Sequence, residues 1–481
     1  MPTRLTVTKQ EIENGLRNAG IREGDTVLLH SSVWSMGIVE GGPRTVIDAF
    51  FTVLGKTGTL AVPAFGDFGA ICRLIRNDPR AIQSIQLPGR IAAIGPRANE
   101  LCHDHHLAKT AHGENTPYTR LAEAGGWVCL LGVDQDRNTT LHSAEALLQL
   151  PYLSEEVFEF QSDETARTRT FRHYPGPHRD FIGLDRRLRK AGITRIVHIG
   201  QATVRTMKAR ELIDFCQDLG EQDPTYALCK NPNCADCVSQ HAAIRRHRLK
   251  NEPFILAASA SLAGRYVPEM IENLNACGLR HIELDLAQAT PLERMEPSTL
   301  CAIVEQLTKS NIAVTALRTA GVPAKPESLC RIAKELAIPR LVIPLTGEAE
   351  ATITMAQSSG LDVLVSNVIH GAAAVGALFD RLEGVGLAMS PCAFARCGEN
   401  PFLNSLNESK ARHYLKQLDV EDCLFDGTPA ALGHGNAEIK ELVSILRCGG
   451  FDGTLVLSSG NRSIGTLKQI VEQFDAILDE I

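Results

Sequence analysis

The chain has 481 residues, of which 44% are hydrophobic and 22% are charged, and its formal net charge is -7 at pH 7. These values are ordinary for globular proteins, and the length predicts two domains of roughly 230 to 250 residues each. The acidic balance disfavours nucleic acid and anionic lipid as partners. No stretch approaches roughly 20 consecutive apolar residues, and residues 1–16 lack the apolar segment of a signal peptide, so we expect a cytoplasmic protein without a membrane segment.

The first half of the chain alternates helical and strand-like patterns, which predicts an α/β domain. Helices and strands are expected in turn at residues 8–20, 25–32, 42–55, 58–65 and 126–133. The polar, cysteine-containing segment at 229–252 interrupts this pattern. We place the domain boundary at its end, so that the first domain covers residues 1–251 and includes a cysteine-rich tail at 229–241.

Residues 252–481 show a more regular pattern of apolar, β-rich runs, most of them separated by helical patterns. The eight runs lie at residues 254–260, 279–286, 312–317, 340–345, 361–367, 384–390, 420–426 and 451–459. Eight β/α units in about 230 residues is the number expected for a (β/α)8 TIM barrel. The predicted fold is therefore an α/β domain followed by a TIM barrel.

The stretch NTTLHSAEALLQL, residues 138–150, places a histidine and a glutamate in the first turn of a predicted helix. His142 and Glu145 share one helical face, because residues three apart are neighbours on a helix surface. The positive end of the helix favours neutral His142, which can act as a general base, and Glu145 can orient the ring. The alternative is a capped helix whose histidine and glutamate are merely solvated, and spacing alone favours that alternative.

Several blocks of the first half resemble the aminoglycoside 3-N-acetyltransferase family. They are residues 24–67, GRIAAIGPRANEL, HGENTPYTRL and GWVCLLGVDQDRNTTLHSAE, which occur in the family's order, and the resemblance covers roughly residues 5–215. This family transfers an acetyl group from acetyl-coenzyme A to an amine, in its known members the 3-amino group of a 2-deoxystreptamine antibiotic. The resemblance implies an antibiotic-resistance acyltransferase with acetyl-coenzyme A as cosubstrate and a small-molecule amine as partner.

The resemblance also implies roles for the histidine and the glutamate. His142 would take the proton of the amine while the nitrogen attacks the thioester carbonyl directly, and Glu145 would orient the ring. The chemistry requires such a base, because an ammonium ion has no lone pair with which to attack.

Further residues are assigned to binding by the same resemblance. Ser31 and Ser32, at the end of a predicted strand, and Thr116 would contact acetyl-coenzyme A. Asp67 would lie near the amino sugar, where a carboxylate attracts a cation. Asp180 is the carboxylate of the Arg- and His-rich loop at 169–181 that we expect to bind substrate.

Three of the 14 cysteines are clustered as Cys229, Cys234 and Cys237, and His241 follows four residues later. Three thiolates and an imidazole can surround zinc tetrahedrally, as in structural zinc sites. Uncoordinated thiols are one alternative. The spacing also resembles a plant-type iron–sulfur run, which needs a distant fourth cysteine. We interpret the cluster as a candidate structural zinc site.

The second half resembles the xylose isomerase-like TIM barrels at residues 368–382, 390–402 and 433–459. That resemblance implies sugar isomerases or epimerases, which hold a divalent metal with carboxylates and histidine at strand ends. Here serines stand where carboxylates are expected, namely Ser366, Ser390, Ser458 and Ser459, and hydroxyls are poor ligands for such metals. Five polar groups remain near strand ends: Glu283, Asp285, His370, Asp426 and His434.

We therefore expect a degenerate barrel that serves binding, assembly or domain support. Sugar isomerase or epimerase activity in the barrel is one alternative function of the chain. A non-catalytic protein that binds coenzyme A or a sugar is another. The sequence leaves the acceptor amine unnamed and a homo-oligomer open.

Overall fold

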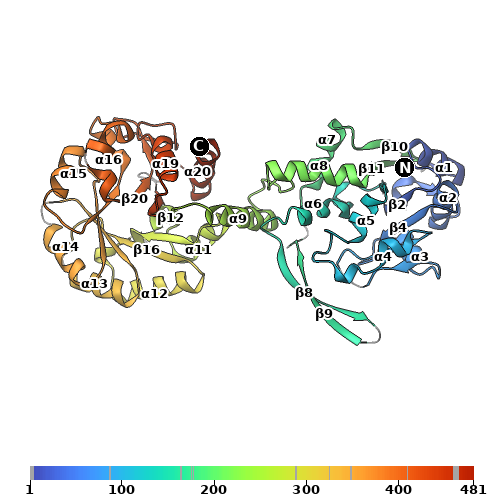
Figure 1. The fold of residues 1–481 in the computed structure, drawn as a ribbon, viewed down its shortest axis with the longest axis horizontal. Helices are drawn as coiled ribbons and strands as arrows, with labels where there is room; N and C mark the ends of the chain where they lie inside the picture. The colour runs from blue at the N-terminus through green and yellow to red at the C-terminus, as the bar shows by residue number, and fades with distance from the viewer. Residues whose placement is uncertain are drawn as a thin grey trace. The chain divides into compact units, whose positions relative to one another are not determined.

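The computed structural model describes residues 5–85, 88–162, 165–174, 176, 178–287, 290–323, 326–346, 349–408, 410–458 and 465–481. The chain forms two compact units, Met1–Gln240 and His241–Ile481, and the division falls inside helix α9 (Ala235–Leu249) (Figure 1). Among the described residues, no helix is both long enough and apolar enough to cross a membrane.

A seven-stranded mixed sheet forms the centre of the first unit, in the order β10-β11-β7-β2-β4-β6-β5. The three strands expected from the sequence are its parallel centre, and antiparallel strands extend it on both sides. The strands are β2 (Thr26–Ser31), β4 (Thr59–Pro63), β5 (Ile82–Gln83), β6 (Ile91–Ile94), β7 (Trp127–Leu131), β10 (Arg195–Ile199) and β11 (Ala202–Lys208). Because β2 and β7 are parallel and Ser31 pairs with Leu131, the segments that follow both strands meet at one edge of the sheet.

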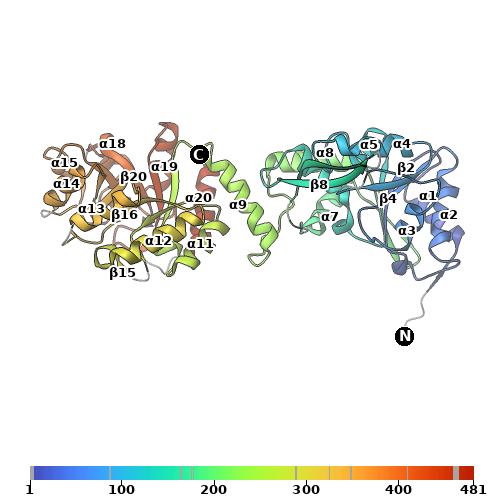
Figure 2. The same cartoon turned by 90° about the horizontal axis from the view of Figure 1, so that it is seen from below.

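Helices cover both faces of this sheet. Figure 2 shows α4, α5 and α8 on one side of β2 and β4, and α1, α2 and α3 on the other. The capping box of Thr8 and Glu11 begins α1 (Lys9–Asn18), which buries Ile12 and Leu16 in the core. The other helices are α2 (Pro43–Leu54), α3 (Ala70–Arg76), α4 (Ala98–Cys102), α5 (Pro117–Glu123), α6 (His142–Leu147), α7 (Phe181–Lys190) and α8 (Ala209–Gln222).

A long β-hairpin belongs to the first unit but lies outside its main sheet. Strands β8 (Ser154–Ser162) and β9 (Thr165–His173) pair antiparallel over nine residues each and project from the unit (Figure 1). Phe160 and Phe171 pack together, whereas Val157 is 69% exposed. The sequence analysis did not predict this hairpin, whose second strand leads directly to the residues beside His142.

The second unit is a closed barrel of eight parallel strands, in the order β12-β13-β16-β17-β18-β19-β20-β23. The predicted number of strands is thereby confirmed. The strands are β12 (Ile255–Ser259), β13 (His281–Leu284), β16 (Ala313–Arg318), β17 (Arg340–Pro344), β18 (Asp362–Ser366), β19 (Gly386–Met389), β20 (Leu415–Val420) and β23 (Thr454–Leu457).

The predicted position of the seventh barrel strand is wrong. The apolar run at 420–426 was expected to form it, but the strand is β20, which ends where that run begins. Gln417 and Asp419 are buried within β20, and these polar residues interrupt the apolar pattern that identified the other strands.

Helices surround the barrel and bury its apolar outer face (Figure 1). They are α10 (Ala260–Ala263), α11 (Val267–Ala276), α12 (Pro297–Lys309), α13 (Pro326–Glu335), α14 (Ala349–Ser358), α15 (Ala372–Phe379), α16 (Pro391–Arg396), α17 (Leu406–Glu408), α18 (Ala411–Tyr414), α19 (Ile439–Cys448) and α20 (Leu467–Glu480). A separate cluster of small and branched side chains comes from four consecutive strands, β16 to β19: Ala316, Val342, Leu364 and Ala388. Such buried side chains fill the interior of a (β/α)8 barrel.

Candidate active site

A cavity of about 830 Å³ lies in the first unit, beside the edge at which β2 and β7 end. Its volume is in the range of sites that enclose a drug-sized molecule. The residues that line it include His30, Ser31, Ser32, Pro63, Phe65, Asp67, Val133, Asp136, Asn138, Thr139, His142, Glu156, His173, Tyr174 and Phe181. Parallel strand ends and the segments that follow them therefore bring together groups from distant parts of the sequence.

His142 and Glu145 form a hydrogen-bonded pair at this cavity. His142 begins α6, and its Nδ1 lies 2.5 Å from Glu145 Oε2. An ionised carboxylate only accepts hydrogen bonds, so Nδ1 carries the proton and Nε2 of the neutral ring keeps its lone pair. The side chain of Glu145 is fully buried, whereas His142 is 8% exposed and lines the cavity. This arrangement is that of a general base with an orienting carboxylate.

Two further residues hold Glu145 in place. Its Oε1 accepts a hydrogen bond of 2.6 Å from the Tyr152 hydroxyl and one of 2.5 Å from Arg179 Nε. Burial by itself raises the pKa of Glu145, but the interactions with His142, Arg179 and Tyr152 outweigh burial and lower the pKa to about 2. The carboxylate is therefore ionised at neutral pH. Neither partner was predicted from the sequence, and only the place of Arg179 in the Arg- and His-rich loop at 169–181 could have indicated one of them.

The histidine is kept neutral mainly by burial. Burial lowers the pKa of His142 below its ordinary value of 6.5, Glu145 opposes this effect, and Arg179 adds to it. The neutral form was expected, but the helix end was expected to cause it. Helix α6 has only six residues, and the desolvation of the imidazolium is the larger effect.

Aromatic side chains fix the plane of the imidazole. The Tyr174 ring stacks on the His142 ring with centroids 3.6 Å apart, and Phe181 meets it edge-on at 4.9 Å. His112 lies 5.4 Å away between centroids, and burial lowers its pKa well below the ordinary value. The sequence analysis missed Tyr174 and His112, which approach His142 only through the folding of the β9 end and the segment before α5.

Three of the predicted binding residues lie at the cavity. Ser31 and Ser32 line it where β2 ends, next to His30, whose pKa burial lowers to about 3. Asp67 also lines it and forms an ion pair with Arg73, with atoms 2.7 Å apart. Its carboxylate is therefore partly neutralised by a neighbour on α3.

The structure places the other two predicted binding residues outside the set that lines the cavity. Thr116 is fully buried, and its hydroxyl donates a hydrogen bond of 2.7 Å to the Gly113 carbonyl just before α5. Asp180 precedes α7, and its carboxylate accepts a hydrogen bond of 3.1 Å from the Gly183 amide. Both residues satisfy the backbone at a helix start, which is a common role for threonine and aspartate.

Two acidic residues that the sequence analysis missed do line the cavity. Asp136 follows β7 and lies 3.2 Å from Arg137, and Glu156 comes from strand β8 of the hairpin. Among the described residues, none forms an ion pair with Glu156. Together with Asp67, these groups give the cavity carboxylates that favour a cationic ligand.

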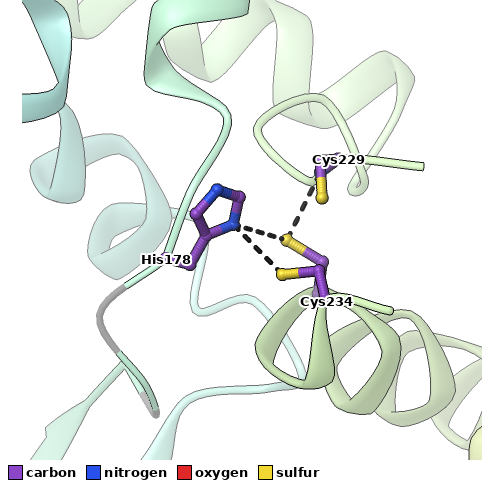
Figure 3. A group of neighbouring side chains, drawn as sticks. His178, Cys229 and Cys234 are labelled. Atoms are coloured by element: carbon purple, nitrogen blue, oxygen red, sulfur yellow. Dashed lines mark hydrogen bonds between the residues drawn. The ribbon is translucent and has the colours of Figure 1, made fainter. Parts of the chain in front are cut away.

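The cysteine cluster gathers around a different histidine from the one predicted. One ligand atom from each of His178, Cys229, Cys234 and Cys237 lies within 4.8 Å of the others, and His241 is not in this set. Figure 3 shows His178 and the sulfur atoms of Cys229 and Cys234 directed toward one another. Cys237 lies in the first turn of α9 and His241 in its second, so His241 is further along the helix than the gathered sulfur atoms. The sulfur atoms gather at the first turn of α9, where the loop before α7 supplies His178.

The barrel has a buried ion-pair network at the ends of its strands. Arg318 Nε lies 2.6 Å from Glu283 Oε1, and its Nη2 lies 2.6 Å from Asp419 Oδ1. Arg318 also donates a hydrogen bond to Ser366. Neither Arg318 nor Asp419 was predicted from the sequence. Arg318 follows the apolar run of β16, and Asp419 interrupts the apolar pattern of β20. The guanidinium thus bridges the carboxylates at the strand ends.

The other polar groups expected near the barrel strand ends have structural partners. Asp285 accepts from Ser261, His370 pairs with the Leu345 carbonyl, Asp426 accepts from the Thr428 amide, His434 pairs with the Leu432 carbonyl, and Ser390 donates to Glu421. Ser459 lies outside the described residues. In the described part of the barrel these groups are thus engaged with one another or with the backbone.

Comparison with known proteins identifies the family of the first unit. Residues 28–68 and 66–221 match the family model described as aminoglycoside 3-N-acetyltransferase. Aminoglycoside N(3)-acetyltransferase VIII of Streptomyces fradiae is 28% identical over 258 residues, which cover 44% of this chain and 90% of that protein. Aminoglycoside N(3)-acetyltransferase III of Serratia marcescens is 30% identical over 186 residues, which cover 32% of this chain and 69% of that protein.

Solved structures are similar to part of the chain. The apoenzyme of aminoglycoside acetyltransferase AAC(3)-IVa is 26% identical, with a TM-score of 0.46, over 51% of this chain and 99% of its own. The family model and the 30% identity to a relative matched over more than two thirds of its length agree. The chain belongs to the aminoglycoside 3-N-acetyltransferase family.

Proposed function

We propose that the protein is an acetyl-coenzyme A-dependent N-acetyltransferase that acts on an amine of an aminoglycoside or a related amino sugar. The observation that carries this proposal is a neutral histidine, His142, held by the ionised Glu145 at the wall of a cavity of about 830 Å³. Membership of the family supports the reaction class, since the matched relatives are named aminoglycoside N(3)-acetyltransferases.

His142 acts as the general base. Its Nε2 accepts a proton from the amine while the nitrogen forms a bond to the thioester carbonyl carbon. The carbon–sulfur bond then breaks, coenzyme A leaves as the thiolate, and the imidazolium gives the proton to this thiolate. Glu145 stabilises the imidazolium through its fixed negative charge, and no covalent acyl-enzyme is required.

Ser31 and Ser32 contact acetyl-coenzyme A at the end of β2, where small side chains let a cosubstrate approach the backbone. Asp67, Asp136 and Glu156, which also line the cavity, attract the cationic acceptor. Tyr174 keeps the imidazole plane fixed by stacking on it. For the reaction to proceed, the amine must bind within hydrogen-bond reach of His142 Nε2 and next to the thioester.

The barrel is a degenerate TIM barrel of the xylose isomerase-like group that serves binding, assembly or support. The bridge that Arg318 makes between Glu283 and Asp419 supports this view, because a guanidinium at that point opposes a divalent cation. Sugar isomerase activity is therefore disfavoured for the chain.

A mass-spectrometric assay with acetyl-coenzyme A and a panel of amines tests the proposal. We expect an acetylated aminoglycoside or amino sugar with the full chain and its loss with His142→Ala. His103→Ala is the matched control, since that histidine is half exposed and does not line the cavity. Coenzyme A binding without turnover would contradict the proposal, as would metal-dependent turnover of a sugar.

A further inference from the structure

We propose that His178, Cys229, Cys234 and Cys237 bind one zinc ion, and that this ion positions Arg179 against Glu145. The first part is independent of the acetyltransferase activity, whereas the second rests on the proposed function. Neither the family match nor the relatives' names include a metal.

The distances between the side chains fit a tetrahedral site. His178 Nδ1 lies 3.3 Å from the sulfur atoms of both Cys234 and Cys237. Around a tetrahedral zinc ion, with Zn–S near 2.3 Å and Zn–N near 2.0 Å, neighbouring ligand atoms are roughly 3.5 to 3.8 Å apart. Only small side-chain movements therefore separate the cluster from a zinc-bound geometry.

The chemistry of the four groups also favours zinc. Three thiolates and one imidazole form a closed structural set with no position left for substrate. The Cys229 amide lies 3.3 Å from Cys237 Sγ and donates toward it, as expected for a coordinated thiolate that accepts a hydrogen bond. An iron–sulfur cluster in the plant-type pattern needs four cysteines, and here the fourth group is a histidine.

The cluster joins two segments that are distant in sequence. His178 comes from the loop before α7, while the cysteines lie 51 to 59 residues later, before and within the first turn of α9. The His178 amide donates a hydrogen bond of 3.0 Å to Asp236 in that same turn. A bound ion therefore fixes the loop to the start of α9.

That loop carries the arginine that holds Glu145. Arg179 is adjacent to His178, and its Nη1 donates a hydrogen bond of 2.7 Å to the His178 carbonyl. Its Nε lies 2.5 Å from Glu145 Oε1, on the opposite oxygen from His142. Three hydrogen bonds thus connect the zinc ligand His178 to the base His142: Arg179 to the His178 carbonyl, Arg179 to Glu145, and His142 to Glu145. Arg179 is therefore a positioning residue.

Metal analysis of the full chain, purified under reducing conditions, tests the site. We expect one zinc per chain, and a tetrahedral, thiolate-rich absorption spectrum when Co²⁺ replaces zinc. His178→Ala should weaken zinc binding by more than about 100-fold, because even partners of metal ligands contribute 10- to 100-fold. The control His241→Ala should retain the metal. A chain without stoichiometric zinc, or equal losses in both variants, would overturn the site.

The positioning role is tested by the pH dependence of kcat/KM. Arg179 lowers the pKa of His142, so releasing the arginine should raise the midpoint of the acid limb in His178→Ala and reduce kcat. His178→Cys, which restores four zinc ligands, should reverse both changes. If the wild-type chain binds zinc, but its loss in His178→Ala leaves the midpoint of the acid limb unchanged, the positioning role is wrong. A wild-type chain that binds zinc without acetylating any amine contradicts the proposed function only.

Discussion

Each unit of the molecule buries a glutamate against an arginine, but the two pairs are completed differently. In the first unit, Glu145 binds Arg179 with one oxygen and His142 with the other, and His142 lines a cavity. In the barrel, Glu283 binds Arg318 with one oxygen and the Gln417 amide with the other. The partners of the first glutamate thus include an imidazole that can gain and lose a proton, whereas Arg318 and Gln417 cannot do so near neutral pH.

The comparison shows what makes a buried ion pair useful for chemistry. A buried carboxylate is costly to desolvate and needs partners in either case. When one partner is an imidazole at a cavity wall, the carboxylate can stabilise a charge that appears during reaction. When all partners are permanent donors, the pair only stabilises the fold. Variants in the two units should therefore affect different properties.

The largest expected effect is on catalysis in the first unit. His142→Ala should lower kcat/KM for amine acetylation by about 10²- to 10⁴-fold, the usual contribution of a general base. Initial rates with acetyl-coenzyme A measure this change, and thermal unfolding confirms that the variant is folded. His103→Ala should keep the wild-type rate. A His142→Ala rate close to that of His103→Ala would show that His142 is not the general base.

The matching change in the barrel should affect stability and leave catalysis intact. Arg318→Ala leaves Glu283 and Asp419 buried together without their cation, which should lower the free energy of unfolding of this unit by about 3 to 5 kcal/mol. Urea unfolding followed by circular dichroism measures the loss. Adding Glu283→Gln and Asp419→Asn should recover part of it. If the wild-type barrel instead turned over a sugar with added Mg²⁺ or Mn²⁺, the network would have to be a functional site.

Removing only the charge of the first glutamate should have an intermediate effect. Glu145→Gln keeps the size of the side chain but loses the negative charge that stabilises the imidazolium and pairs with Arg179. We expect kcat to fall about 10- to 100-fold, as for other groups that orient a histidine. The same substitution in the barrel, Glu283→Gln, should leave kcat unchanged. Equal effects of the two substitutions on kcat would show that the pairs do not differ as described.

The pH dependence of the wild-type enzyme sharpens the assignment of the base. Burial lowers the pKa of His142 below 6.5, and the base must be neutral to work. Activity should therefore be full at neutral pH and be lost as the pH falls through this lowered pKa. Because Glu145 raises the pKa of His142, the acid limb of Glu145→Gln should move to still lower pH. A limb with its midpoint above 6.5 would point to another titrating group.

The smallest expected effect concerns the acidic residues at the cavity. Glu156→Gln should raise KM for a cationic amine about 2- to 5-fold with little change in kcat, since partly exposed charge interactions contribute about 0.2 to 1 kcal/mol. The difference should shrink as salt is added. Glu159→Gln, on the same strand but not among the residues that line this cavity, is the control. An equal rise in KM for both variants would indicate a general charge effect of the hairpin.

Several features followed from local sequence patterns. The first helix, the central strands of the first sheet, the eight-stranded barrel and the contact of His142 with Glu145 depend on residues close in sequence or on repeated apolar runs. Periodicity and short spacings are physical consequences of helix and strand geometry, so they can be recognised without a structure. The seventh barrel strand was misplaced because its buried polar residues interrupt that periodicity.

Other features depend on contacts that no spacing encodes. Arg179 reaches Glu145 across 34 residues, His178 reaches Cys237 across 59, and Arg318 reaches Asp419 across 101. Thr116 and Asp180 have the residue types of a binding site but serve the backbone at helix starts. Sequence alone could not distinguish these roles, since each polar side chain can bind either a ligand or its own chain.

The sequence by itself determined the two-part α/β architecture and the histidine–glutamate pair, because both follow from repeats and spacings within one element or one β/α unit. Only the tertiary structure decided which arginine completes each buried glutamate, which histidine joins the cysteines, and which carboxylates face the cavity. The physical reason is that burial and charge pairing are set by the groups that packing brings within a few ångströms, whatever their separation along the chain.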